Sequence, residues 1–310
     1  MAGLAGVAIA QTYPAKPIRY VVPFAPGGTT DILGRLVSQK LSEAWGQQVI
    51  VDNRPGAGGA LGAELVAKSP PDGYNLIGGT ISTHAINPSV YAKLAYDPVK
   101  DFEAVTMLAT QPNMLVVNPS LPARNVAELI VLLKASPAKY TYSTSGNGTS
   151  AHLSGELFKS MTGTSMQHVP YKGSPQALAD VIGGQVSMSF DNISTAYAQA
   201  KAGKLRALAV TTAKRSSIAP EVPTLAESGL AGYELGSWHG VFVPAGTPKD
   251  IVAKLNAEIV KAIHSADVQQ KLQALGVEPV GNSAETFAAF VRAEVPKWAK
   301  VVKESGAKVE

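Results

Sequence analysis

Cysteine is absent from this chain of 310 residues, which excludes disulfides and thiolate metal sites. Charged residues make up only 16% and aromatic residues 6%, and no basic run is interleaved with aromatics, so no nucleic-acid partner is expected. No stretch reaches the roughly 18 consecutive apolar residues of a membrane-spanning helix. With 45% apolar residues and a net charge of +4, the composition is that of a globular protein with a substantial core.

The motifs of common enzyme classes are missing as well. There is no Gly-x-Ser-x-Gly elbow, no His-Glu-x-x-His helix and no Walker A sequence. The glycine-rich string at 56–62 resembles a dinucleotide fingerprint, but the following strand ends in no acidic residue, so a structural turn is predicted there. Of the five histidines, three lie beside turns rich in glycine, serine or threonine and are candidates to face a ligand: His84, His152 and His239. No cofactor and no metal are expected.

The first ten residues are apolar and read as the remnant of a signal peptide. Residues 8–10, Ala-Ile-Ala, have the small-x-small form of a signal-peptidase site, although the basic segment that precedes such a site is missing. An apolar N-terminal tail is the alternative interpretation. We therefore expect an exported, soluble protein of the periplasm, with residues 1–10 removed.

Short β-rich runs alternate with helical patterns along the chain, which predicts an α/β fold with mainly parallel sheets. The first strand is expected at 18–22, followed by a helix from Thr30, as its N-cap, to about Trp45. Separate strands are expected at 104–109 and 114–117, on either side of Gln-Pro-Asn.

The last third of the chain shows the same alternation of strand and helix patterns, and no flexible linker precedes it. Thr247 and Pro248 are the expected N-cap and first-turn residues of a helix over 249–264. Because no Gly/Ser-rich linker separates domains, a two-domain chain is expected to cross between them more than once, near 111–114 and again near 233–238.

Two glycine-rich turns carry most of the functional information. The segment 23–31, Pro-Phe-Ala-Pro-Gly-Gly-Thr-Thr-Asp, follows a strand and leads into a helix, and the segment 143–150, Ser-Thr-Ser-Gly-Asn-Gly-Thr-Ser, repeats that arrangement. Such turns leave unpaired N–H groups at the positive end of a helix, which suits a carboxylate or phosphate. Two of them with little charged chemistry nearby predict a protein that holds a small acid without transforming it. Bulky substitution of Gly28 or Gly148 is then expected to abolish binding while the fold survives.

Several strings, in order, resemble one receptor family from about residue 13 to the C-terminus. They are Tyr-Pro-Ala-Lys-Pro-Ile-Arg at 13–19, the glycine turn at 22–31, Val-Asp-Asn-Arg-Pro-Gly-Ala-Gly-Gly at 51–59, Thr-His-Ala-Ile-Asn-Pro at 83–88, Ser-Gly-Asn-Gly-Thr-Ser-Ala-His-Leu at 145–153, Val-Pro-Tyr-Lys-Gly at 169–173, Gly-Gly-Gln-Val at 183–186, Phe-Asp-Asn at 190–192 and Pro-Ala-Gly-Thr-Pro at 244–248. Together they are similar to the extracytoplasmic substrate-binding receptors of tripartite tricarboxylate transporters, the Bug family.

The resemblance implies a two-lobed periplasmic-binding-protein clamshell with a small carboxylate bound between the lobes. Lobe 1 would comprise residues 11–112 plus 236–310, and lobe 2 residues 113–235. The ligand would be a dicarboxylate, a tricarboxylate or an aromatic acid, with an aromatic dicarboxylate among the candidates. The implied partners are the membrane permease subunits of the transporter, and the receptor is expected to be a monomer.

In this family, backbone amides and hydroxyls of two loops hold the ligand carboxylate. Carried onto this chain, the residues implied for the two loops are Phe24, Gly27, Gly28, Thr29, Thr30 and Asp31, then Ser145, Asn147, Gly148, Thr149 and Ser150. Outside the loops, the implied residues are Ser82, Thr83, Tyr171, Lys172 and Asp191.

At the second crossover, Trp238 fits the family, whereas the neighbouring His239 does not look generic and is expected to tune ligand choice. An aromatic pair there would suit a flat aromatic acid, and plain packing of Trp238 between lobes is the alternative. For His84 and His152 a structural role is preferred. Two other functions stay open: an enzyme that acts on a small carboxylic acid with Asp31, Asp191 and a cleft histidine, and a sensory receptor that presents its ligand to a signalling protein.

Overall fold

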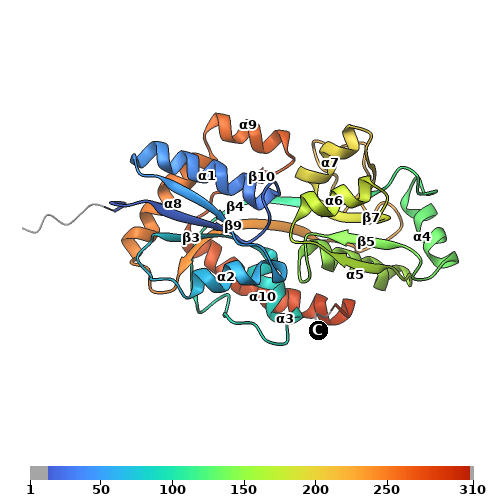
Figure 1. Ribbon diagram of the computed structural model, residues 1–310, viewed down its shortest axis with the longest axis horizontal. Helices are drawn as coiled ribbons and strands as arrows, with labels where there is room; N and C mark the ends of the chain where they lie inside the picture. Colours follow the sequence, from blue (N-terminus) through green and yellow to red (C-terminus); the bar gives the residue numbers. More distant parts are fainter. Residues whose placement is uncertain (1–12, 308–310) are drawn as a thin grey trace, which may run out of the picture.

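The computed structural model describes residues 13–307, so the predicted signal-peptide remnant at 1–10 lies outside the described residues. Two groups of strands and helices lie side by side (Figure 1). The first group, the first lobe, contains β1 (Ile18–Val22), α1 (Thr29–Trp45), β2 (Val49–Asn53), α2 (Ala60–Ala67), β3 (Asn75–Thr80), η2 (Ser82–Ile86), α3 (Asn87–Val90), α8 (Lys249–Ile263), α9 (Ala266–Ala274) and β10 (Glu278–Pro279). The second lobe contains α4 (Val126–Ala135), β5 (Thr141–Thr144), α5 (Ser150–Thr162), β6 (Gln167–Pro170), α6 (Ser174–Ile182), β7 (Met188–Asn192), α7 (Ile193–Lys201) and β8 (Arg206–Val210).

Two strands connect the lobes. β4 (Phe102–Val117) pairs with β9 (Gly236–Pro244) as far as Pro112, and from Asn113 onward it pairs with β7 and β8. The two separate strands expected at 104–109 and 114–117 are therefore one continuous strand, since proline's fixed φ is compatible with extended backbone. β9 brings the chain back from the second lobe to the first, so the chain crosses more than once.

The α/β fold is as expected, and its sheets are mixed. Within each lobe the strands of the βα units are parallel: β1 with β2 and β3, and β5 with β6 and β7. All antiparallel pairs include one of the two connecting strands, β4 or β9. The parallel pattern thus belongs to the βα units, and the crossing strands add the antiparallel pairs.

Two helix starts differ from the sequence prediction. α1 begins at Thr29, with Gly28 as its N-cap, and the Thr30 hydroxyl does not cap the helix because it lies against His239. For α8 the N-cap is Pro248, and Thr247 instead donates its hydroxyl proton to the Pro244 carbonyl at 2.7 Å. Both threonines are buried and hydrogen-bonded, but in other roles.

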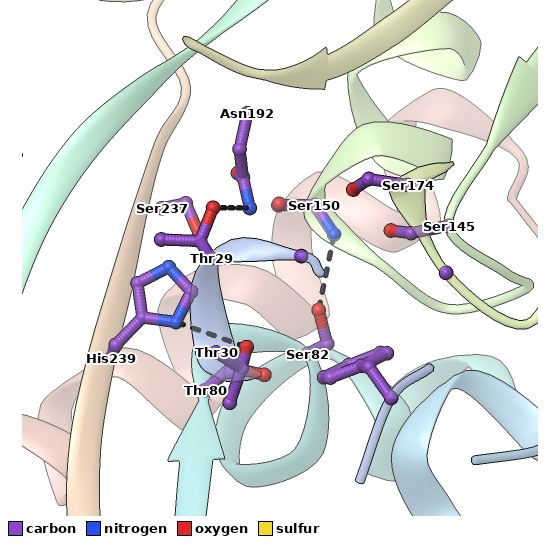
Figure 2. A pocket seen from close by; sticks show the side chains of 13 residues that line it. Thr29, Thr30, Thr80, Ser82, Ser145, Ser150, Ser174, Asn192, Ser237 and His239 are labelled. Carbon is purple, nitrogen blue, oxygen red and sulfur yellow. Dashed lines mark hydrogen bonds between the residues drawn. The ribbon is translucent and has the colours of Figure 1, made fainter. Parts of the chain in front are cut away.

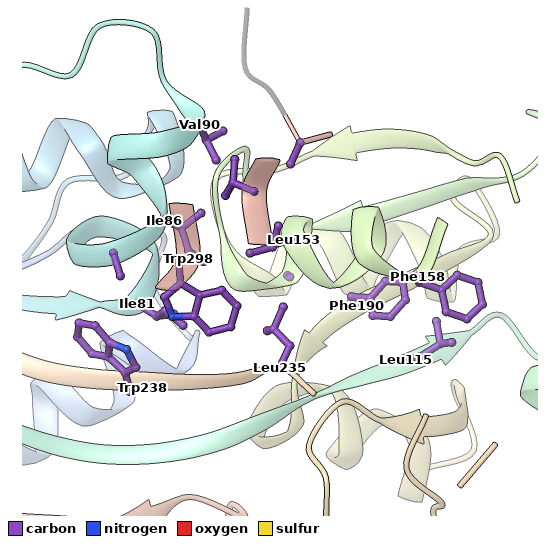
Figure 3. Packing of buried hydrophobic residues seen from close by; sticks show 14 of the residues in the cluster. Ile81, Ile86, Val90, Leu115, Leu153, Phe158, Phe190, Leu235, Trp238 and Trp298 are labelled. Atoms are coloured by element: carbon purple, nitrogen blue, oxygen red, sulfur yellow. The ribbon is translucent and has the colours of Figure 1, made fainter. Parts of the chain in front are cut away.

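One hydrophobic cluster runs through both lobes. It includes Trp298 of the last helix, α10 (Ala284–Ser305), together with Leu153 of α5 and Phe190 of β7 (Figure 3). The second half of α10 thus packs against the second lobe, while its first half covers β4 and β9 with Phe287. None of the helices within residues 13–307 has the length and apolarity needed to span a bilayer.

The lobes also touch across the cleft between them. The Ala25 N–H donates to the Lys172 carbonyl at 3.0 Å, and the Tyr91 hydroxyl donates to the Asn147 carbonyl at 3.2 Å. At Gly58 two backbones meet, because a Cβ atom there would lie 1.9 Å from the Asn147 oxygen. This contact exists only because the residue has no side chain.

Replacing Gly58 with alanine is expected to prevent closure of the lobes without unfolding them. Its φ of +57° makes alanine unfavourable by about 1–2 kcal/mol, and the methyl group would push the Asn147 loop away. Gly203 is the matched control, since it has φ +69° and open space around its Cβ position. Both variants should lose similar stability in urea denaturation, but only Gly58→Ala should show a larger radius of gyration in small-angle scattering. Equal radii for the two variants would contradict this closure contact.

Candidate functional site

A cavity of about 380 Å³, including its open mouth, lies where the two lobes meet. Glycines, side-chain hydroxyl groups, the amide of Asn192 and the rings of Phe24 and His239 form its walls. No side chain that lines the cavity is charged at neutral pH. The lining residues are Phe24, Gly28, Thr29, Thr30, Thr80, Ser82, Ser145, Ser150, Gly173, Ser174, Asn192, Ser237 and His239.

Four helices begin at this cavity. α1, α5, α6 and α7 each follow a parallel strand of their lobe directly (β1, β5, β6 and β7), and their N-caps are Gly28, Thr149, Gly173 and Asn192. Only Thr149 accepts a capping hydrogen bond with its side chain; the other three helices have no side-chain cap. In α1, α6 and α7, the first N–H groups and the positive ends of the helix dipoles are therefore left for another acceptor.

This arrangement suits an anion. Each hydrogen bond from an N–H or hydroxyl to an ionised oxygen contributes about 1.5–3 kcal/mol, and each helix N-terminus adds about 0.3–1 kcal/mol or more in a partly buried site. No metal-binding group of three His, Asp or Glu residues occurs within residues 13–307. The cavity can thus hold a carboxylate.

His239 lies on one wall of the cavity beside Thr30 (Figure 2). Its ring also contacts Gln111. Its Nδ1 is 3.3 Å from the Thr30 hydroxyl, and its Nε2 is 2.9 Å from the Gln111 amide nitrogen. Burial lowers the pKa of His239 to about 4, so the ring is neutral near pH 7. The imidazole therefore takes part as a hydrogen-bonding group and not as a cation.

Hydrogen bonds between the lobes frame the cavity on two sides. The Ser150 N–H donates to the Ser82 hydroxyl at 3.2 Å, and the Asn192 amide donates to the Thr29 hydroxyl at 3.1 Å (Figure 2). The Thr29 hydroxyl also lies 2.5 Å from that of Ser194. The starts of α1 and α7 are thus in direct contact, as are η2 and α5.

Asp191 lies behind the wall of the second lobe. It is 1% exposed, and its Oδ1 accepts hydrogen bonds from the Ser174 hydroxyl at 2.6 Å, the Asn192 N–H at 2.7 Å and the Thr195 hydroxyl at 3.2 Å. Burial raises the pKa of Asp191 to about 6. It does not line the cavity, but it fixes Ser174, which does.

The structure places the predicted site residues in three groups. Those that line the cavity are Phe24, Gly28, Thr29, Thr30, Ser82, Ser145, Ser150 and His239. An adjoining cavity of about 400 Å³, again including its open mouth, shares Phe24 and Ser145 with the first and is also lined by Asn147, Tyr171 and Lys172. The remainder line neither cavity and lie behind or beside them: Gly27, Asp31, Thr83, Gly148, Thr149, Asp191 and Trp238.

Several residues of the third group support the loops. Burial raises the pKa of Asp31, but hydrogen bonds from Arg35 and the Gly27 N–H outweigh it and hold the pKa below its usual range. The Thr83 hydroxyl accepts from the Thr80 N–H at 2.9 Å. These side chains bond to their own lobe, so they shape the turns around the cavity.

Trp238 does not form an aromatic wall with His239. It is 3% exposed, packs edge-on against Phe287 and Phe290, and donates its indole N–H to Glu294 at 3.1 Å. Consecutive residues of a strand point to opposite faces, so on β9 one of the pair faces the cavity and the other faces the core.

The other two candidate histidines also lie away from the cavity. His84 stacks on Phe242 with ring centroids 3.8 Å apart. His152 accepts a hydrogen bond from the Gly148 N–H at 3.2 Å through Nδ1, so it supports the second glycine turn from behind.

Sequence reasoning missed five lining residues: Thr80, Gly173, Ser174, Asn192 and Ser237. For two helix starts the signal was present. Gly173-Ser174-Pro175 is a glycine followed by a proline in the first turn of α6, and Asn192 is a common N-cap residue that follows a strand. Thr80 and Ser237 lie on strands, where nothing local marks them.

The chain is similar to known proteins in both sequence and fold. Residues 33–307 match the family described as "Tripartite tricarboxylate transporter family receptor". The solved structure of Rpa4515 of R. palustris with adipate is 44% identical with a TM-score of 0.92, covering 95% of this chain and 98% of that one. The periplasmic binding protein BugD is 34% identical with a TM-score of 0.92, covering 96% and 100%. MatC (Rpa3494) of Rhodopseudomonas palustris with bound malate is 34% identical with a TM-score of 0.90, covering 94% and 100%.

Buried histidines are expected to make the fold sensitive to acid. Burial lowers the pKa of His84 and His168 to about 3 and that of His152 and His239 to about 4, against about 6.5 in the unfolded chain. Between those values the unfolded chain binds protons that the folded chain does not, so the free energy of unfolding should fall as the pH falls from about 6.5 to 4. Asp191 acts in the opposite sense between about pH 4 and 6, but it is one group against four.

Urea denaturation at about pH 7.5, 6 and 5 measures this dependence, with a slope of up to about 1.4 kcal/mol per pH unit for each histidine. Equal or greater stability at about pH 5 than at 7.5 would show that these histidines are protonated in the fold.

Proposed function

Since this chain belongs to the tripartite tricarboxylate transporter receptors, we propose that it captures a small carboxylate between its lobes. It would then deliver this ligand to the membrane subunits of a tripartite transporter. The family consists of solute-binding proteins and not of enzymes. We further propose that it works in the periplasm, as BugD does, and as a monomer. The two lobes of this proposal are residues 11–112 plus 236–310 and residues 113–235.

One observation carries the proposal: four helix N-termini meet at a cavity without a charged lining residue. An anion is the ligand that such a site stabilises, because unpaired N–H groups and helix dipoles replace the counter-charge. A carboxylate fits better than a larger polyanion, since no Lys or Arg lines the cavity to compensate further charge.

An aliphatic dicarboxylate is the ligand that the proposal favours. The related structures hold adipate and malate, both aliphatic dicarboxylates. A flat aromatic acid is less well supported, because Trp238 faces the core and leaves only Phe24 and His239 as rings on the cavity. The adjoining cavity, with Lys172 in its wall, offers room for the far end of a longer ligand.

Release and capture would require the lobes to separate at the connecting strands. The proposed hinge positions are 111–114 in β4 and 233–238 before and within β9, where the pairing of β4 passes from one sheet to the other. Opening would break the contacts across the cleft, such as the one between Ala25 and Lys172, and a bound acid would compensate for the cost of closing.

A thermal-shift screen tests the ligand class. The chain from Gln11 onward should be melted with succinate, malate, adipate, citrate, terephthalate and the diamides of succinate and adipate. A ligand at roughly 100 times its Kd stabilises the fold by about 2.7 kcal/mol, which raises Tm by several degrees. We expect at least one aliphatic dicarboxylate to do so and neither diamide. Carboxylate recognition would be rejected if a diamide raised Tm as much as its acid, or if none of the acids raised Tm.

Valine at Gly28 should abolish binding and spare the fold. Gly28 has φ −84° and ψ 171°, which valine adopts readily, and its Cβ would lie 3.8 Å from the Ser174 oxygen. The branched side chain would then occupy the cavity. Titration calorimetry with the acid found in the screen should show a loss of about 100-fold or more, equal to about 2.7 kcal/mol. Unchanged affinity in a variant with the normal Tm would remove this turn from the binding site.

A further inference from the structure

The hydroxyl of Ser174 has its proton committed away from the cavity. Ser174 Oγ lies 2.6 Å from Asp191 Oδ1, and a carboxylate oxygen in this position can only accept, so the serine donates. Only the lone pairs of Ser174 are left for a ligand. The hydroxyl on this wall of the cavity is therefore a hydrogen-bond acceptor.

A buried negative charge lies directly behind this wall. All three groups that donate to Asp191 Oδ1 are neutral, and within residues 13–307 no group donates to its Oδ2. The carboxylate sits at the start of α7, through the Asn192 N–H, and reaches the first residue of α6, through Ser174. It therefore offsets the positive ends of two of the four helices.

The opposite side of the cavity offers hydrogen-bond donors and positive helix ends instead of an acceptor. The Ser82 hydroxyl accepts from the Ser150 N–H, which leaves its own proton free to donate. α5 has no acidic residue in its first turn, and Asp31 in that of α1 is paired with Arg35. The dipoles of α1 and α5 thus have no unpaired acidic side chain to offset them, although in α5 the Ser150 N–H already bonds to Ser82 and the His152 N–H to Thr149.

Resting on the proposed carboxylate-binding function, we propose that Asp191 and Ser174 form a selectivity element that takes a hydrogen-bond donor of the ligand. The favoured ligand is then a carboxylate that carries a hydroxyl or an ammonium group, and not the unsubstituted acid. Its carboxylate lies toward α1 and α5, and its donor lies against Ser174. Asp191 acts through Ser174 and by its charge, as a positioning residue.

Two families of acids test this selectivity by titration calorimetry near pH 7.5. Succinate, malate and aspartate differ only in carrying hydrogen, hydroxyl or ammonium at one carbon, and adipate, 2-hydroxyadipate and 2-aminoadipate repeat the series in a longer chain. We expect a hydroxy or amino acid to bind at least about fivefold more tightly than the unsubstituted acid of its series. The two substituted arms tell a hydroxyl ligand from an ammonium ligand.

Two variants assign the preference to these residues. Asp191→Asn keeps an oxygen for the three donors and removes the charge, so it should reduce any preference for the amino acid about tenfold. Ser174→Ala removes the acceptor and should bring the hydroxy acid to within about twofold of the unsubstituted acid. Glu221→Gln is the control, because this exposed carboxylate of the second lobe bonds to Tyr197 and lines neither cavity. Ratios measured on one variant cancel any general weakening of the site.

The outcomes separate this inference from the proposed function. If unsubstituted acids bind as tightly as substituted ones, or if both variants keep the ratio of the unaltered protein, the selectivity element is wrong and carboxylate recognition stands. If no acid of either series binds, both proposals fail together.

Discussion

The site depends on the direction of the βα units. In a parallel sheet every strand ends at the same edge, and the helix that follows begins there. Here β1 delivers α1 to that edge in the first lobe, and β5, β6 and β7 deliver α5, α6 and α7 to it in the second. Because the two edges face each other, backbone N–H groups from both lobes point at one cavity without any charged lining residue. The proposed anion binding would then depend mainly on the main chain, and the lining side chains would select among anions.

Side chains that are absent matter as much as those present. The approach of the lobes at Gly58 and the Asn147 loop leaves no room for a methyl group, and a Cβ on Gly148 would lie 2.5 Å from the Asn87 side chain. Both contacts hold the second glycine turn against the first lobe. Gly58 and Gly148 thus allow the close approach of the two lobes.

Much of this architecture follows from local sequence patterns. The βα alternation predicts the fold class, and the glycine turns at 23–31 and 143–150 contain six of the eight predicted lining residues, because periodicity and turn chemistry are local properties. The other two are Ser82, which the family resemblance implied, and His239, which lies outside both turns. The continuity of β4 through Pro112 was not predicted, since a proline between apolar runs is read as a break. The burial of Trp238 agrees with the packing alternative, and strand alternation places its side chain on the face opposite His239. Contacts between distant turns, such as Ser82 with Ser150, depend on how the lobes sit together, which no local pattern contains.

One hydrophobic cluster passes from Trp238 and Phe287 through Trp298 of α10 to Leu153 and Phe190, so the lobes share it, although each lobe also has a buried cluster of its own. Opening the cleft by hinge bending is thus compatible with a chain that melts in one cooperative step, because neither lobe can expose its share of the cluster alone. A ligand held at the boundary would then shield segments far from it, including the C-terminal helix, from proteolysis. The shared cluster would also make either lobe, if expressed by itself, prone to aggregate through the face that α10 normally covers.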